Sequence, residues 1–316
     1  MKRIAHIVLL VFISHFALLI SSCEKLLDVD DNMADRQMVL NAIPSAGDSA
    51  FVYFAYTHFF LDNNNDNPVP FSSMTLTVNG VPYYHCADSG CCYFFPYVLQ
   101  PDDSLSIDIQ TADRTVHAAT YVPRYPDVSN MRVTRFESSS FNYYHAQFDL
   151  SDHAGYPEYY RMKVMVRDSG ERYNTWTRKF DTIDSMYSTY FLLPFNNEIT
   201  SNEVNPYIPM GGYLYSTAMF LDRNIEGRSN YPVDMYIMLL VDTNEVQPFK
   251  HWYNISVESI TPARWNYLLS ASSSTGMNSM FAEQGQAYGN VEGALGIFAG
   301  RSKWEYVFDA DTVGQQ

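Results

Sequence analysis

The sequence predicts a mostly β protein built from two sandwich-type domains, and two observations support this. The 316 residues include 25 tyrosines and 20 phenylalanines, and these residue types favour the pleated, half-buried surface of a sheet. Short apolar or alternating runs also recur about every 8–12 residues with turn signals between them, a spacing typical of sandwiches. The expected fold is an N-terminal immunoglobulin-like β-sandwich followed by a larger β-sandwich or barrel-like domain with one short helix.

The first domain is expected at residues 38–124. Asn79-Gly80 separates two strand-like runs, which is the strongest short-range signal for a hairpin. Pro82 marks the second arm as a short or edge strand, and Pro123 and Pro126 end the pattern because proline does not fit a central strand. The strands of this domain are expected at 38–43, 50–60, 74–78, 81–84, 92–99, 104–110 and 115–122.

The second domain is expected at residues 125–316. Its helix has clear signals, because Thr261 is a good N-cap, Pro262 suits the first helical position, and Ala263–Ala271 follows. Residues 182–210 show no clear period and are expected to be irregular. Gly155, Pro157 and Asp168-Ser169-Gly170 supply breaks between strands, which are expected at 131–136, 143–150, 159–167, 173–181, 213–221, 233–241 and 252–259.

The N-terminus predicts an exported, lipid-anchored protein. Lys2 and Arg3 precede an apolar run over residues 4–20, which is the form of a secretory signal. The closing Ile20-Ser21-Ser22-Cys23 resembles a bacterial lipobox, which predicts a signal peptide at 1–22 and a lipid on Cys23. The alternatives are a plain signal peptide and a membrane helix, and the run is at the low edge of the length that a span needs.

Residues 23–37 are expected to form an acidic tether. Such a stretch after the lipidated cysteine resembles the surface-export signal of Bacteroidota lipoproteins, although a solvated linker has the same composition. The expected location is therefore the outer membrane, lipid-anchored and exposed at the cell surface. The formal net charge of −15 argues against binding nucleic acid or anionic lipid, because both need a basic patch.

Three further cysteines, Cys86, Cys91 and Cys92, lie in one short stretch. In an exported chain a disulfide is the default, and Cys86 is expected to pair with Cys91 or Cys92. The alternatives are free thiols and a metal site that includes His85, but the paired C-x-x-C spacing of common zinc sites is missing. No metal is predicted here.

No catalytic or cofactor motif is found in the chain. Asp62, Asn64 and Asp66 have the spacing of a calcium loop, but Asn67 replaces the required glycine and Ser73 the closing glutamate. The histidines form no H-E-x-x-H pair, and no G-x-S-x-G nucleophile turn is present. Exposed tyrosines are also able to stack on sugars or other ligands, although sheet packing accounts for most of them better.

The C-terminal run Asn290–Gly300 resembles the closing motif of a Bacteroidota lipoprotein family, domain of unknown function 4249. The cysteine stretch departs from the family pattern. The motif contains Gly293, Gly296 and Gly300. Because glycine permits sharp turns and close backbone approach, these residues are interpreted as structural and not as ligand-binding. Shorter matches lie at Val39–Ala42, Tyr121–Pro123, Phe148-Asp149, Tyr159–Arg161 and Phe220–Asp222.

This resemblance implies an outer-membrane lipoprotein, often encoded near transporters of the TonB-dependent type, with no established catalytic residues. The expected function is therefore non-enzymatic: capture of a ligand, or an accessory role in a TonB-dependent uptake system whose transporter is the partner. The alternatives are a structural or adhesive protein of the fimbrillin type, which a missing strand would favour, and a hydrolase, which convergent carboxylates in a cleft would favour.

Five short Asp-Ser/Thr-apolar patterns resemble the sites at which Bacteroidota export systems attach O-linked glycans. The acceptor residues are Ser49, Ser104, Thr182, Ser185 and Thr312. Glycans need exposed positions, so Thr182 or Ser185 is favoured, at the start of the expected irregular region.

Overall fold

The computed structural model describes residues 36–57, 67–137, 142–153, 155, 157–174, 176–194, 212–238, 245–273 and 287–313. The predicted fold class is confirmed, because 65% of the structure is strand and 6% is helical. Several expectations lie outside the described residues: the signal peptide, Cys23, almost all of the acidic tether, and the loop with Asp62, Asn64 and Asp66.

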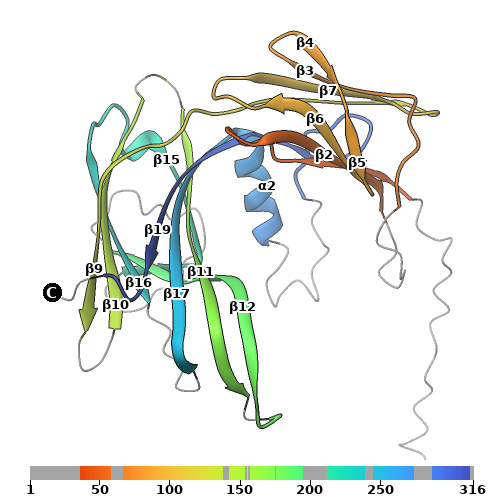
Figure 1. The fold of residues 1–316 in the computed structure, drawn as a ribbon. Helices are drawn as coiled ribbons and strands as arrows, with labels where there is room; N and C mark the ends of the chain where they lie inside the picture. The colour runs from red at the N-terminus through yellow and green to blue at the C-terminus, as the bar shows by residue number, and fades with distance from the viewer. Residues whose placement is uncertain are drawn as a thin grey trace, which may run out of the picture. The chain divides into compact units, whose positions relative to one another are not determined.

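The first sandwich consists of two sheets (Figure 1). One has the order β18 (Leu295–Phe298), β1 (Met38–Ala42), β2 (Ser49–Tyr56), β6 (Cys92–Val98) and β5 (Ala87–Ser89). The other has the order β4 (Val81–Tyr84), β3 (Ser73–Val78), β7 (Ser104–Gln110) and β8 (Thr115–Tyr121). The Asn79-Gly80 hairpin is confirmed, with φ of 51° and 82° at its two turn residues. Alternate residues such as Leu40, Phe54 and Ile107 meet in one core.

The C-terminal motif joins this first sandwich, although the sequence placed it in the second domain. β18 pairs in parallel with β1, so that Gly296 lies opposite Leu40. A Cβ added at Gly296, where φ is +112°, would lie 2.1 Å from the Leu40 carbonyl oxygen. The expected close backbone approach is therefore present. The domain predicted at residues 125–316 includes a strand of the first sandwich because this pairing joins residues far apart in sequence.

The second sandwich also has two sheets (Figure 1). One has the order β14 (Gly212–Tyr215), β13 (Phe191–Pro194), β16 (Tyr231–Met238), β10 (Asn142–Ser151) and β9 (Asp127–Glu137). The other has the order β12 (Lys179–Thr189), β11 (Tyr159–Asn174), β17 (Glu245–Ile260) and β19 (Arg301–Asp309), and β15 (Thr217–Leu221) also pairs with β11. Their inner faces share a core that includes Tyr144, Tyr160 and Tyr253. No sheet closes into a barrel among the described residues.

Three strand predictions in this sandwich were wrong. The strand predicted at 213–221 divides into β14 and β15, which pair in different sheets. Strand β11 runs without a break through Asp168-Ser169-Gly170, because a shift in its register with β17 absorbs the irregularity there. The residues predicted as a strand at 173–181 instead include the turn that joins β11 to β12 in an antiparallel hairpin. Asn174 ends β11 and its side-chain oxygen accepts hydrogen bonds from the backbone N–H groups of Trp176 and Thr177. Strand β12 then extends to Thr189, so residues 182–189 are not irregular.

The predicted helix is confirmed as α2 (Pro262–Ser273). The hydroxyl of Thr261 accepts a long hydrogen bond from the backbone N–H of Arg264, at 3.5 Å, which agrees with its predicted role as N-cap. Trp265 packs with Met219 and Ile260. Within the described residues, no helix has the length and apolar character to cross a membrane.

Candidate functional site

The outward face of the β9–β10–β16 sheet carries a row of polar and aromatic side chains. Strand β10 alternates, so that Tyr144, Ala146 and Phe148 enter the core while the residues between them point outward. The pairing register places Gln147 of β10 between Arg132 of β9 and Asp234 of β16. Two consecutive strands, β9 and β10, and the distant strand β16 thus bring a guanidinium, an amide and a carboxylate into one line.

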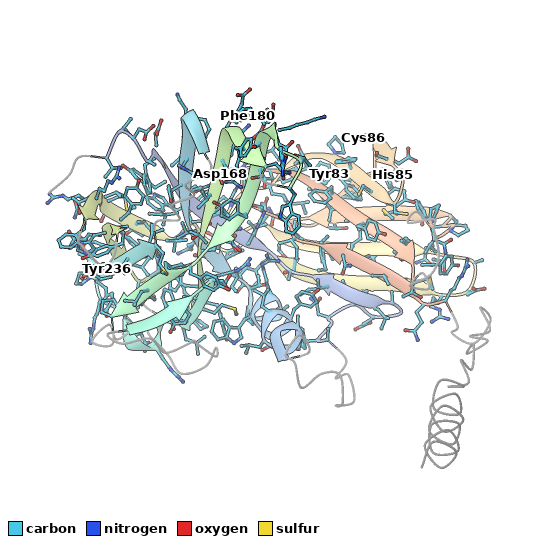
Figure 2. All side chains as sticks on the ribbon, turned by 90° about the horizontal axis from the view of Figure 1, so that it is seen from below. Tyr83, His85, Cys86, Asp168, Phe180 and Tyr236 are labelled. Atoms are coloured by element: carbon cyan, nitrogen blue, oxygen red, sulfur yellow. The ribbon has the colours of Figure 1, made fainter. Side chains whose placement is uncertain are left out.

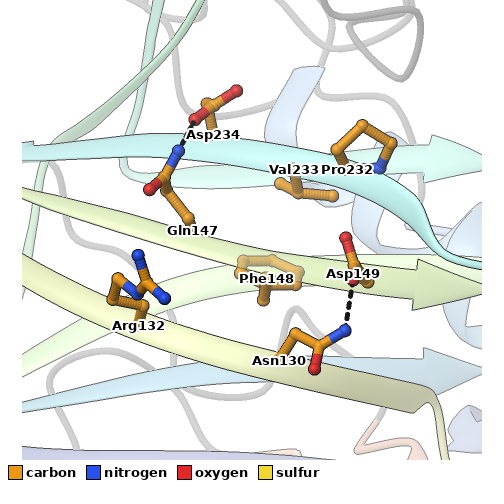
Figure 3. Close-up of a pocket in the computed structure, with 8 residues that line it drawn as sticks. All are labelled: Asn130, Arg132, Gln147, Phe148, Asp149, Pro232, Val233 and Asp234. Atoms are coloured by element: carbon orange, nitrogen blue, oxygen red, sulfur yellow. Dashed lines mark hydrogen bonds between the residues drawn. The ribbon is translucent and has the colours of Figure 1, made fainter.

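A hollow of about 220 Å³ lies on this face (Figure 3). A shift in the β9–β10 register between Gln147 and Asp149 interrupts the ladder here, and Asn130 has a φ of 54°. Such bulges re-aim side chains and locally open a sheet. The hollow, called the β9–β10–β16 hollow below, is lined by Asn130, Arg132, Gln147, Phe148, Asp149, Pro232, Val233 and Asp234.

The polar side chains of the hollow are held by two sets of hydrogen bonds. Oδ1 of Asp234 accepts a bond of 2.9 Å from Nε2 of Gln147 and lies 2.8 Å from Nε2 of His145. Asn130 donates to Oδ2 of Asp149 over 2.6 Å (Figure 3). Oδ2 of Asp234, Oδ1 of Asp149 and the amide oxygens of Gln147 and Asn130 have no side-chain partner among the described residues. These acceptors are fixed in place and remain open to a ligand.

Aromatic rings flank the polar row along the same strands. His145 and Tyr236 stack at 4.5 Å with an interplanar angle of 6°, and Phe136 stacks on Tyr143 at 4.9 Å. Tyr143 in turn meets Tyr236 edge to face at 5.3 Å. Figure 2 labels Tyr236 in this sheet. Burial, with the nearby Asp234 and Tyr143, raises the pKa of Tyr236, so its hydroxyl stays protonated and able to donate.

The side chains that line the hollow are able to bind a polar ligand. Its lining contains no serine, cysteine or lysine, which are the usual nucleophiles. Nowhere in the described residues do three or more His, Cys, Asp or Glu side chains gather as a metal ion would require. What the lining offers is several hydrogen-bond acceptors and one guanidinium donor, while the side chains of Phe148 and Val233 belong to the core on the other side of the sheet.

A second hollow, of about 300 Å³, is lined by Glu158 and His153 among others. Burial raises the pKa of Glu158 and of Asp222, which is a feature of some catalytic carboxylates. Both carboxylates are engaged in holding the fold, however. Glu158 accepts a short hydrogen bond from the Tyr160 hydroxyl, and Asp222 accepts one of 2.6 Å from the backbone N–H of Glu158. Their arrangement fixes the turn at η1 (Asp222–Asn224).

The largest of these hollows, about 620 Å³, lies beside the C-terminal motif and has mostly apolar walls. Asn41, Tyr267 and Tyr288 contribute its polar side chains. The side-chain oxygen of Asn41 already accepts a hydrogen bond of 3.2 Å from the backbone N–H of Ile297. This hollow therefore has little to orient a polar ligand.

The predicted disulfide is not formed, because no S–S bond joins Cys86, Cys91 and Cys92 to one another. The hairpin of β5 and β6 places Cys92 opposite Ser89. Cys86, which Figure 2 labels, lies three residues farther along the strand. Its backbone N–H donates to the carbonyl oxygen of Phe94. Three residues of strand span about 10 Å, well beyond the roughly 4.4–6.8 Å between Cα atoms that a disulfide requires.

All five predicted glycosylation residues are exposed, and none lines the β9–β10–β16 hollow. Thr182 and Ser185 lie on β12, which is the edge strand of its sheet. Sequence reasoning missed the hollow itself. Its only sequence signal is the alternation of Tyr143, His145, Gln147 and Asp149 with core residues, and nothing in one sequence shows which strands lie beside β10.

Comparisons with solved structures gave only distant likenesses. β-Glucuronidase 3 of Bacteroides uniformis is 9% identical with a TM-score of 0.20, over 72% of this chain and 25% of that one. A putative membrane anchored protein from Corynebacterium diphtheriae is 8% identical with a TM-score of 0.20, over 72% of this chain and 55% of that one. A search of curated proteins found no match.

A comparison with models of protein families, in contrast, gave a match over most of the chain. The model described as "Domain of unknown function (DUF4249)" matches residues 24–306, which is most of the chain. This family carries no catalytic description. The chain therefore belongs to the DUF4249 family.

Proposed function

We propose that this protein is a non-enzymatic lipoprotein of the outer membrane, exposed at the cell surface, that captures a saccharide in the β9–β10–β16 hollow. Capture would serve a TonB-dependent uptake system, a role that rests on the family resemblance and on the lipobox at Cys23. The observation that supports the binding role is the fixed set of open acceptors beside Arg132.

A polyhydroxylated ligand fits this set best. A hydroxyl group both donates and accepts, so neighbouring hydroxyls of a sugar ring would satisfy the carboxylates of Asp149 and Asp234 and the guanidinium of Arg132 together. Two carboxylates against one guanidinium disfavour an anionic ligand. The volume of about 220 Å³ is below the range of about 300–1,000 Å³ that holds drug-sized ligands, and so suits a single sugar ring.

Calorimetric titration of the full chain against a panel of neutral mono- and oligosaccharides tests this proposal. We expect at least one saccharide to bind, and Asp234→Asn and Arg132→Met to weaken that binding tenfold or more, because each leaves ligand groups unpaired. The matched controls are Asp184→Asn and Arg167→Met, which change an exposed ion pair elsewhere in the same sandwich. Absence of saccharide binding, or equal loss in the controls, would reject the hollow as the site.

The membrane anchor is tested separately. Cys23→Ala should move the protein from the membrane to the soluble extracytoplasmic fraction, because no lipid would then be attached. Retention of this variant in carbonate-washed membranes would show that something other than the lipid holds it. This result bears on location alone and leaves the saccharide test unaffected.

One observation favours the fimbrillin-like alternative. Strand β12 is an eleven-residue edge strand with mostly exposed side chains, and an open edge is where another chain can add a strand. Its charges, including Lys179, Asp181 and Asp184, are of the kind that discourage such pairing. Polymers of the purified protein in electron micrographs would favour this alternative over ligand capture.

A further inference from the structure

A cluster of charged side chains surrounds Glu258 on the outward face of the other sheet of the second sandwich. Glu258, on β17, is completely buried. Its carboxylate lies 3.3 Å from the side-chain nitrogens of Arg161 and Lys163 on β11 and of Arg301 at the start of β19. Arg264, on α2, is 8% exposed and interacts with Glu258 electrostatically. These five residues are called the Glu258 cluster below.

Positive charge exceeds negative charge in this cluster. Four cations face the carboxylate of Glu258, and Lys163 also interacts with Glu305, in a chain whose net charge is −15 and which has only 20 lysines and arginines. Burial, together with repulsion by Arg161 and Arg301, lowers the pKa of Arg264 to about 10 against the attraction of Glu258. Like charges held together at low dielectric are costly unless a counter-charge is present.

Hydrogen-bond donors also exceed acceptors in this cluster. The Nε–H groups of Arg161, Arg264 and Arg301 are buried and have no acceptor among the residues that the structure describes. Arginine and lysine only donate, and Glu258 supplies just two acceptor oxygens for all four side chains. Buried polar groups in native proteins are nearly always paired, so three unpaired donors in one cluster require an explanation.

We propose that the Glu258 cluster binds a small oxyanion of the phosphate or sulfate type. Such an ion supplies both the negative charge and the several acceptor oxygens that the cluster needs, and the arginine fork matches its geometry. The side chains of Arg161, Lys163 and Arg301 are 18%, 24% and 24% exposed, so the cluster is accessible from solvent. This site is separate from the β9–β10–β16 hollow, and neither proposal depends on the other.

Thermal unfolding of the full chain in rising sodium phosphate or sodium sulfate, at constant ionic strength set with chloride, tests the proposal. A ligand that binds only the folded state raises the unfolding midpoint, by roughly 5 °C at a hundredfold excess over its dissociation constant. We expect this saturable rise with the wild type. Broadening of the ³¹P resonance of added phosphate by the wild-type protein should show the same binding directly.

Arg264→Met should abolish the rise, because it removes the most buried cation while keeping an apolar chain of similar length. Lys163→Gln, at a more exposed position, should weaken it and serves if Arg264→Met does not fold. Arg167→Met is the matched control and should leave it unchanged, since Arg167 pairs with Asp184 in solvent. The proposal is overturned if neither oxyanion acts differently from chloride on the wild type, or if the effect persists undiminished in both cluster variants.

Discussion

The two sheets of the second sandwich share one core, yet their outward faces differ in burial and in charge. The β9–β10–β16 face has an open hollow with two carboxylates, one guanidinium and four acceptors that remain available. The β11–β17–β19 face has the Glu258 cluster, with one fully buried carboxylate among four cations. Both faces follow from the same alternation of inward and outward residues.

This difference shows that burial determines the role of a polar cluster. In the hollow, solvent competes for each hydrogen bond, so the side chains contribute little to stability and stay available to a ligand. Around Glu258, solvent is mostly excluded, so each charge depends on its neighbours and the loss of one affects the whole cluster. Substitutions in the hollow should therefore change saccharide binding with little effect on stability, whereas removal of a charge around Glu258 should lower stability.

The largest effect is expected for Glu258→Gln. It leaves four cations without their buried carboxylate, and breaking a buried pair in this way costs about 3–5 kcal/mol. Urea unfolding measures the loss. Glu305→Gln is the control, because Glu305 on β19 makes a similar pair with Lys303 at 2.9 Å but is about one-third exposed. Equal losses in the two variants would contradict the claim that burial makes Glu258 the more important carboxylate for stability.

The pH dependence of stability should reveal the contribution of Glu258 separately from those of the other carboxylates. Burial opposes ionisation of Glu258, but Arg161, Lys163, Arg301 and Arg264 outweigh it and hold the pKa of Glu258 below its usual value of 4.5. Its folded pKa is therefore depressed, so its contribution is present above pH 4.5 and is lost as the pH falls through the folded value.

Below pH 4.5 the wild type should therefore lose stability more steeply than Glu258→Gln. Urea unfolding of both proteins between pH 3 and pH 7 measures the two slopes. Parallel curves would mean that Glu258 titrates normally in the folded protein.

A smaller change is expected for His145→Gln on the open face. His145 stacks on Tyr236 and contacts Asp234 at 2.8 Å, but both partners are part-exposed. A part-exposed contact of this kind contributes about 1 kcal/mol or less. Thermal unfolding at pH 7 should show a loss of that size, and a loss comparable to that of Glu258→Gln would mean that the hollow is a structural cluster.

The smallest change in stability is expected for Arg132→Met. Arg132 is exposed, and substitutions at such positions usually alter the free energy of unfolding by no more than about 0.5 kcal/mol. Urea unfolding should give a value in this range while saccharide affinity falls tenfold or more. A large loss of stability would instead show that Arg132 stabilises the folded protein.

Local signals in the sequence predicted local structure well. The strand at Ser104–Gln110, the Asn79-Gly80 turn and the Thr261 cap each depend on a few neighbouring residues, and all three are present. Pairings between distant strands were not predictable, because alternation shows which residues face outward but not which strand lies alongside. The joining of β18 to β1 is one such pairing, and it alters the domain boundary.

Both candidate sites depend on that same missing information. Gln147 and Asp234 meet only because β10 and β16 are neighbours, and Glu258 meets Arg161 only because β17 lies beside β11. The disulfide prediction failed for a related reason. Proximity of Cys86 and Cys92 in sequence suggested pairing, but the extended hairpin separates them along the strand.

Carboxyl footprinting tests the central claim, that the β9–β10–β16 face binds the ligand, most directly. Carbodiimide labelling of the full chain, read by peptide mass spectrometry, would be compared with and without a bound saccharide. The account predicts that the saccharide lowers labelling of Asp149 and Asp234, while labelling of Asp181 and Asp184 on β12 stays the same. Unchanged labelling of Asp149 and Asp234 in the presence of a saccharide that demonstrably binds would contradict it.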